Sequence, residues 1–176
     1  ESYTVKETEA PNGYTAAGDF ALTVNADGTL SASSTGVTVK KDGDIYKVEV
    51  ENIKDDSKTQ TTSYTVKHVV GGVEQTADTK TYNGTAWVNE KDPTIEIVAG
   101  SLDPKTYTGY KFSSIDNDAK DGDEVASGTV ITLPYVKDDS KTQTTSYTVK
   151  HVVDGVEQTA DTKTYNDTAW INEENP

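Results

Sequence analysis

The chain has 176 residues, 32% of them hydrophobic, which suits one to three small domains with thin cores. Its 30 acidic residues outnumber its 16 basic residues, all of them lysines, and the net charge of -14 argues against the positive surface that nucleic-acid binding requires. The absence of cysteine excludes disulfides and thiolate metal sites, and no run reaches the ~18 apolar residues of a membrane-spanning helix.

The first stretch, residues 3–14, predicts a strand that ends in a turn. Tyr3, Val5 and Glu7 alternate with polar residues and therefore share one face. Residues 11–13, with the sequence Pro-Asn-Gly, have the chemistry of a turn. Glu7 lies where an apolar residue is expected, and an unpaired buried carboxylate is costly. Either the alternation ends there or Glu7 has a chemical role.

The remainder of residues 1–53 predicts further strands separated by turns. Apolar residues alternate with polar ones at Phe20, Leu22 and Val24, at Val37 and Val39, and at Tyr46, Val48 and Val50. Asn52 continues the inward face of the last strand. Glu7 and Asn52 therefore suggest a carboxyl group paired with a carboxamide. The alternative is two ordinary strand-end residues that are hydrogen-bonded or solvated.

A resemblance to a known family is carried by eight residues of the first stretch, Tyr3, Val5, Glu7, Thr8, Ala10, Pro11, Gly13 and Tyr14. They resemble the glutamate-containing motif of the Cna B-type (SpaA-like, prealbumin-like) domains of Gram-positive surface proteins and pilins, from which only Val5 departs. The later segments 20–24 and 48–52 also look like that family. The resemblance implies that residues 1–53 are the C-terminal part of an Ig/prealbumin-like β-sandwich that lacks its N-terminal strand or strands.

The same resemblance implies an intramolecular Lys–Asn isopeptide bond. Glu7 would be the catalytic acid/base and Asn52 the acceptor of a lysine amine. The family's lysine lies in a strand before the glutamate motif, and Lys6 points outward by alternation. The nucleophilic lysine is therefore expected outside this chain, in a strand that precedes residue 1 or that a neighbouring copy or chain donates.

A sequence repeat organises the rest of the chain. Residues 54–93 recur at 137–176, with differences at Gly71/Asp154, Gly84/Asp167, Val88/Ile171, Lys91/Glu174 and Asp92/Asn175. Near-identical tandem copies indicate an array. We expect a complete repeat over residues 54–136 and a truncated second copy over residues 137–176, which open with polar linkers at 54–63 and 137–146.

The complete repeat predicts a small β domain. Residues 74–80 allow one short helix, and Pro134 in the closing strand predicts an edge strand or a bulge. The repeat loosely resembles the MucBP-type and other β-grasp-like repeats of bacterial adhesins through Tyr64-Thr-Val-Lys-x-Val, Gly71-Gly72, Thr-Gly109-Tyr110 and Pro134-Tyr135-Val136-Lys137. The resemblance implies tandem β-grasp-like domains in a rod-like array, with a role as a stalk or in contact with mucin or glycans.

Aromatic residues at equivalent positions of the two copies are candidates for ligand binding. Trp87 follows Tyr82 in the first copy, and Trp170 follows Tyr165 in the second. Exposed, these rings would stack on sugars. The alternative is that one Trp anchors each thin core.

Two further features bear on metal binding. His68 and His151 are repeat-equivalent, and we expect them on a strand surface or half-buried, with metal ligation as the alternative. An acidic loop predicts a solvated turn, and its oxygen-rich side chains suggest Ca²⁺ as the alternative, although its spacing misses the EF-hand pattern. The carboxylates of that loop are Asp116, Asp118, Asp121 and Asp123. We expect no other metal and no cofactor.

The predicted function is structural. Phosphate loops, serine nucleophile elbows and zinc-ligand spacings are absent, so the only expected catalysis is a single autocatalytic turnover that forms the isopeptide bond. We expect a stalk or adhesin region of a Gram-positive bacterium, extracellular and either cell wall-anchored or secreted. The alternatives are a module that binds a host or microbial glycoprotein or glycan, and an accessory array of a secreted hydrolase.

Overall fold

The computed structural model describes residues 1–175, and they are mostly β, with 50% in strands and 5% in short helical turns. The prediction of a mostly β fold is confirmed. The chain folds as two compact units. The first unit comprises residues 1–62 and 83–94, and the second comprises residues 63–82 and those from 95 onward. No helical segment in residues 1–175 has the length and apolar character needed to span a bilayer.

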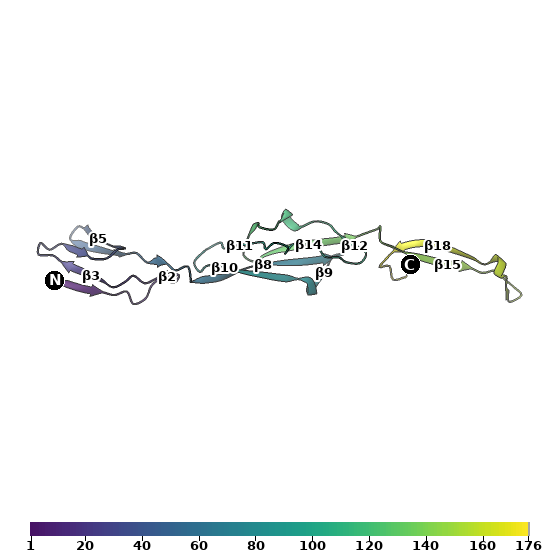
Figure 1. Cartoon of the computed structure of the whole chain (residues 1–176), viewed down its shortest axis with the longest axis horizontal. Coiled ribbons are helices and arrows are strands. Elements are labelled where there is room, and N and C mark those ends of the chain that lie inside the picture. Colours follow the sequence, from purple (N-terminus) through teal and green to yellow (C-terminus); the bar gives the residue numbers. More distant parts are fainter. Residues whose placement is uncertain (176) are drawn as a thin grey trace. The chain divides into compact units, whose positions relative to one another are not determined.

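Seven short strands form the sheets at the start of the chain, coloured purple to blue in Figure 1. They are β1 Ser2–Val5, β2 Tyr14–Thr15, β3 Phe20–Val24, β4 Leu30–Ala32, β5 Val37–Asp42, β6 Ile45–Val50 and β7 Ile53–Lys54. The order β1-β3-β4 makes a three-stranded sheet, while β2 pairs with β7 and β5 pairs with β6. Phe20 is the one buried apolar side chain in residues 1–62. The core here is as thin as the composition predicts.

The central sheet has the order β10-β8-β14-β12, and β9 also pairs with β8 (Figure 1). Its strands are β8 Thr59–Val70, β9 Val73–Glu74, β10 Lys80–Trp87, β12 Tyr110–Phe112 and β14 Thr129–Lys137. Strands β11 Thr94–Glu96 and β13 Glu124–Ala126 form a separate pair. A 3₁₀ turn at Thr76–Asp78 falls where a short helix is allowed, and a second occurs at Asp116–Asp118.

The core of the second unit is built on alternation in two long strands. Every second residue of β8 from Tyr64 to Val70 is buried, and β14 runs parallel to β8 from Thr129 opposite Tyr64 to Tyr135 opposite Val70. The buried hydrophobic cluster comprises Tyr64, Val66, Val70, Ile95, Ile97, Leu102, Ile131, Leu133 and Tyr135. Each such side chain contributes about 1.5–3 kcal/mol through burial, so these residues hold the unit together.

Pro134 departs from the prediction of an edge strand or a bulge. It lies in β14, which has β8 on one side and β12 on the other. The Pro134 carbonyl accepts the Ser113 amide at 2.9 Å, so the proline nitrogen faces the same side as that carbonyl. Strand β12 ends at Phe112. Because the missing N–H faces the point where β12 has already ended, proline is tolerated in this interior strand.

Residues of the second sequence copy form the same elements as the first, except that two strands, β15 and β16, take the place of the single long strand β8. The elements are β15 Thr142–Val149, β16 Val152–Val153, β17 Val156–Glu157, a 3₁₀ turn at Thr159–Asp161 and β18 Lys163–Trp170. Tyr147 is 63% exposed, whereas its equivalent Tyr64 is fully buried. The same sequence therefore occupies two environments. Pro176, the last residue of this copy, lies outside the described residues.

The buried Tyr64 hydroxyl yields a prediction. It donates to Ser101 Oγ at 2.8 Å and accepts the Val98 amide at 3.0 Å. Tyr64→Phe removes both hydrogen bonds and leaves the buried Ser101 hydroxyl without this partner, so it is expected to lower the free energy of unfolding by about 1–3 kcal/mol in urea denaturation. Hydrogen exchange at the Val98 amide is expected to accelerate.

The repeat-equivalent substitution is the matched control. Tyr147→Phe acts on an exposed ring and is expected to change the free energy of unfolding by no more than about 0.5 kcal/mol. Equal losses in Tyr64→Phe and Tyr147→Phe would contradict the assignment of the buried hydroxyl.

Candidate functional site

Glu7 and Asn52 come together in the first unit. Glu7 Oε2 lies 2.6 Å from Asn52 Nδ2, and it also accepts a hydrogen bond from the Ala17 amide at 2.6 Å. Asn52 Nδ2 also donates to the Thr15 carbonyl oxygen at 3.3 Å. Both side chains are half-buried. A carboxyl group in this position can pass a proton to the carboxamide nitrogen.

The local sequence explains this contact. Glu7 follows β1 and leads into a turn in which the Tyr14 amide donates to the Pro11 carbonyl at 3.0 Å. Strand β2 then pairs with β7. Asn52 directly precedes β7, so this pairing brings Asn52 beside the segment that follows Glu7.

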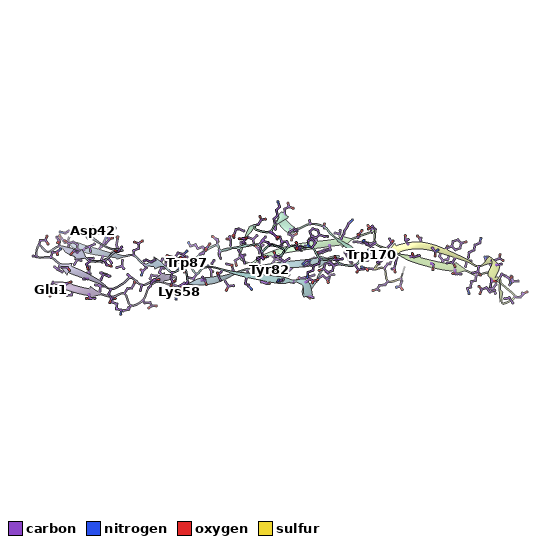
Figure 2. The ribbon with its side chains drawn as sticks, in the orientation of Figure 1. Glu1, Asp42, Lys58, Tyr82, Trp87 and Trp170 are labelled. Atoms are coloured by element: carbon purple, nitrogen blue, oxygen red, sulfur yellow. The ribbon has the colours of Figure 1, made fainter. Side chains whose placement is uncertain are left out.

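Trp87, a predicted ligand-binding residue, packs on the same turn. Its indole Nε1 donates to the Gly13 carbonyl at 3.1 Å, and its ring meets the Tyr14 ring edge-on, with centroids 5.4 Å apart. Lys54 Nζ lies 5.1 Å from the indole centroid. Figure 2 shows Trp87 near Lys58. Trp87 is half-buried and is absent from the buried cluster of the second unit, so it anchors a turn of the first 53 residues.

Trp170 makes the equivalent contacts in the second unit. Its indole Nε1 donates to the Gly109 carbonyl at 3.0 Å, and its ring meets Tyr110 edge-on at 5.3 Å. Lys137 Nζ lies 5.3 Å from the indole centroid. The side chain is half-buried. Both Trp residues therefore have their polar atom occupied by a glycine carbonyl.

The two predicted tyrosines lie on strands and stack on tyrosine partners. Tyr82 is half-buried and stacks on Tyr64, with centroids 4.9 Å apart and planes inclined by 9°. Tyr165 is 46% exposed and stacks on Tyr147 at 5.1 Å. Tyr82 also lines a cavity of about 310 Å³ in the second unit. The other lining residues are Val66, His68, Asp78, Lys80, Gly100, Ser101, Asp103, Pro104 and Lys105.

His68 belongs to a buried polar cluster beside that cavity. Only 3% of His68 is exposed, and its Nδ1 lies 2.9 Å from the Tyr135 hydroxyl. Burial lowers the pKa of the His68 imidazole, and the nearby Lys105 ammonium lowers it further. Tyr107 donates to Asp78 Oδ2 at 2.6 Å. Burial, followed by this hydrogen bond, raises the pKa of the Tyr107 hydroxyl.

Hydrogen bonds from Lys105 and Tyr107 lower the pKa of the Asp78 carboxyl. The neutral His68 imidazole and the charged Asp78 carboxylate are thus the forms that this part of the fold favours.

The residues that the sequence suggested as metal ligands do not come together at one site. His151 is exposed, unlike its equivalent His68. In the acidic loop, Asp121 accepts the Gly100 amide at 2.7 Å and Asp123 accepts the Lys120 amide at 2.8 Å. Across residues 1–175, no three His, Asp or Glu side chains form a group that could hold a metal ion.

Sequence reasoning missed the two turns that receive the Trp side chains. The signal was the dipeptide Gly-Tyr, which occurs at Gly13-Tyr14 and at Gly109-Tyr110 in segments that are otherwise different. Gly13-Tyr14 belongs to the Cna B-type resemblance, and Gly109-Tyr110 belongs to the MucBP-type resemblance. The sequence therefore did not indicate that both dipeptides bind a Trp side chain.

The cluster around His68 predicts a pH dependence. Because the folded state disfavours protonated His68, the unfolded state binds more protons as the pH falls below about 6.5. The free energy of unfolding is therefore expected to decrease between pH 7 and 5, by at most about 1.4 kcal/mol per pH unit from this group. Denaturation in urea at several pH values measures this slope.

His68→Gln is expected to flatten the slope, whereas His151→Gln, at the exposed equivalent position, is expected to keep it. A slope that persists unchanged in His68→Gln would show that another group is responsible.

No family model, curated protein or solved structure matches the chain. The resemblances to Cna B-type domains and to MucBP-type repeats stay predictions.

Proposed function

We propose that this chain is a structural segment of an extracellular bacterial surface protein, a stalk or adhesin region, whose first domain closes a Lys–Asn isopeptide bond. The observation that supports the proposal best is the distance of 2.6 Å between Glu7 Oε2 and Asn52 Nδ2. The proposal includes a Cna B-type β-sandwich for residues 1–53 and β-grasp-like domains for the repeats. It also places the protein on a Gram-positive cell wall or in the secreted fraction.

The isopeptide bond would form by attack of a lysine amine on the Asn52 carboxamide with loss of ammonia. A neutral lysine amine attacks Cγ of Asn52, and a new C–N bond replaces the bond to Nδ2. Glu7 takes a proton from the attacking amine and delivers it to Nδ2, which leaves as ammonia. One amine and one carboxamide thus give one secondary amide and one ammonia. The contact between Glu7 and Nδ2 supports this role because Nδ2 is the leaving group.

The lysine would come from a strand added at the edge of β1. In the order β1-β3-β4, β1 pairs with β3 on one side only. The backbone groups on its other side can pair with a further strand. Glu7 lies two residues beyond the end of β1, so a lysine on the added strand would reach Glu7 and Asn52 from this edge.

Mass spectrometry of the full-length gene product tests the proposal. We expect the intact mass to fall short of the sequence mass by one ammonia, and we expect digestion to release a peptide pair joined through Asn52. Asn52→Ala is expected to restore the full mass, and Glu7→Gln is expected to leave most molecules without the crosslink. Full mass in the unsubstituted protein, or the same deficit in Asn52→Ala, would refute the crosslink.

A second candidate function, binding of a glycan, is favoured by the cavity of about 310 Å³ next to Tyr82. Its lining combines an aromatic ring with hydroxyl, carboxylate and ammonium groups, as recognition of a polar ligand requires. Titration of the full chain with neutral oligosaccharides, followed by NMR, is expected to shift amide resonances around Gly100 and Ser101. Absence of such shifts at millimolar sugar would argue against this candidate.

A further inference from the structure

Two Gly-Tyr turns receive a Trp-bearing segment in the same way. We call residues 11–14 and 107–110 the corners, and residues 87–90 and 170–173 the latches. The first corner and its latch lie within the first compact unit, and the second corner and its latch lie within the second. The two latches come from the two sequence copies, whereas the corners share only their final Gly-Tyr.

The corners have matching backbone geometry. In the first, the Tyr14 amide donates to Pro11 O at 3.0 Å, and in the second the Tyr110 amide donates to Tyr107 O at 3.1 Å. The glycine before each tyrosine has a positive φ, 83° at position 13 and 77° at position 109. Only glycine adopts this conformation without strain.

Each glycine carbonyl accepts two hydrogen bonds. Gly13 O accepts the indole N–H of Trp87 at 3.1 Å and the Asp55 amide at 2.9 Å. For Gly109 O the corresponding distances are 3.0 Å to the Trp170 indole and 2.8 Å to the Asp138 amide. A carbonyl oxygen has two lone pairs, so both acceptor positions are used in each corner.

A second hydrogen bond joins each latch to the residue before the glycine. Asn89 Nδ2 donates to Asn12 O at 2.5 Å, and Asn172 Nδ2 donates to Thr108 O at 2.7 Å. The acceptors are backbone carbonyls, so Asn12 and Thr108 serve equally well. Recognition therefore depends on backbone atoms, glycine and tyrosine, and it tolerates the other differences between the corners.

The latches are preorganised by a glutamine from the neighbouring strand. Gln60 Nε2 donates to the carbonyls of Trp87 and Glu90, at 3.0 and 2.7 Å. In the second copy, Gln143 Nε2 lies 3.1 and 2.8 Å from the carbonyls at positions 170 and 173. The tip that carries each Trp is therefore shaped by its own repeat.

Close approach provides a second reason for glycine. A methyl group at Gly13 would lie 2.5 Å from Asn89 Nδ2 and 3.0 Å from the Trp87 ring. A methyl group at Gly109 would lie 2.6 Å from Asn172 Nδ2. Any side chain at either glycine would therefore collide with the latch, first with its Asn side chain.

We propose that the Gly-Tyr corner is a docking surface for the Trp-Val/Ile-Asn tip of a following copy of this repeat. Docking through this surface attaches repeats both to one another and to the different module formed by residues 1–53. The contact is a generic connector, because a complete repeat contains both a latch, at residues 87–90, and a corner, at residues 107–110. The connector does not depend on the isopeptide bond.

Trp fluorescence of the full chain tests the docking. In a Trp87→Phe background, Trp170 reports on the second corner. Gly109→Ala is expected to shift Trp170 emission to longer wavelength and to increase its quenching by acrylamide. Gly122→Ala is the matched control, because Gly122 also has a positive φ, 85°, but nothing lies within 4 Å of an added methyl group. Emission that stays unchanged in Gly109→Ala, or that shifts equally in both variants, would overturn the proposal.

Converting the sequence of one corner into that of the other tests whether both corners accept the same latch. In a Trp170→Phe background, the double substitution Pro11→Tyr, Asn12→Thr gives the first corner the sequence of the second. We expect Trp87 to stay protected from quenching, whereas Gly13→Ala is expected to expose it. Gly28→Ala is the control, since Gly28 has a φ of 79° and no close neighbour. Exposure of Trp87 in a converted corner that retains the far-UV circular dichroism of the parent would show that corners are not interchangeable.

Discussion

The close approach of a tryptophan indole to a glycine carbonyl is the constraint on which both Gly-Tyr turns depend, one in each compact unit. At Gly13 and at Gly109, a positive φ and a neighbour within 3 Å of any added methyl group leave no other residue suitable. The indole N–H then has a carbonyl partner, as a half-buried Trp requires. Each contact joins about four residues of a corner to about four residues of a latch. It therefore needs no large hydrophobic core behind it.

Local pattern indicated much of the fold and part of the candidate site. Alternation indicated strands throughout and placed Glu7 and Asn52 on inward positions, and the structure brings their side chains to 2.6 Å. Their chemical role stays a proposal. The interior position of Pro134 was not predictable, because it depends on where β12 ends, and a strand's end is set by its partner in space.

The residues that surround His68 and Trp87 could not be predicted from the sequence either. The cluster of His68 draws on Tyr107 and Tyr135, and a period of two says nothing about which distant residues meet. Trp87 ends a strand of one repeat but packs on a turn 74 residues earlier. Identical residues also differ by copy, since Tyr64 is buried and Tyr147 is exposed. Burial there is decided by residues 95–135, which cover the first copy.

The parallel pairing of β8 with β14 has a consequence for a protein under tension. In chain order β8 is the first strand of its sheet and β14 is the last, so force transmitted along the chain would act on these two strands in opposite directions. Because the strands are parallel, the ladder from Thr129–Tyr64 to Tyr135–Val70 is loaded in shear, and its hydrogen bonds resist together. An antiparallel hairpin at the same place would unzip one pair at a time. Tension along the chain would therefore have to break the parallel pairs of β8 and β14 together before this sheet opens.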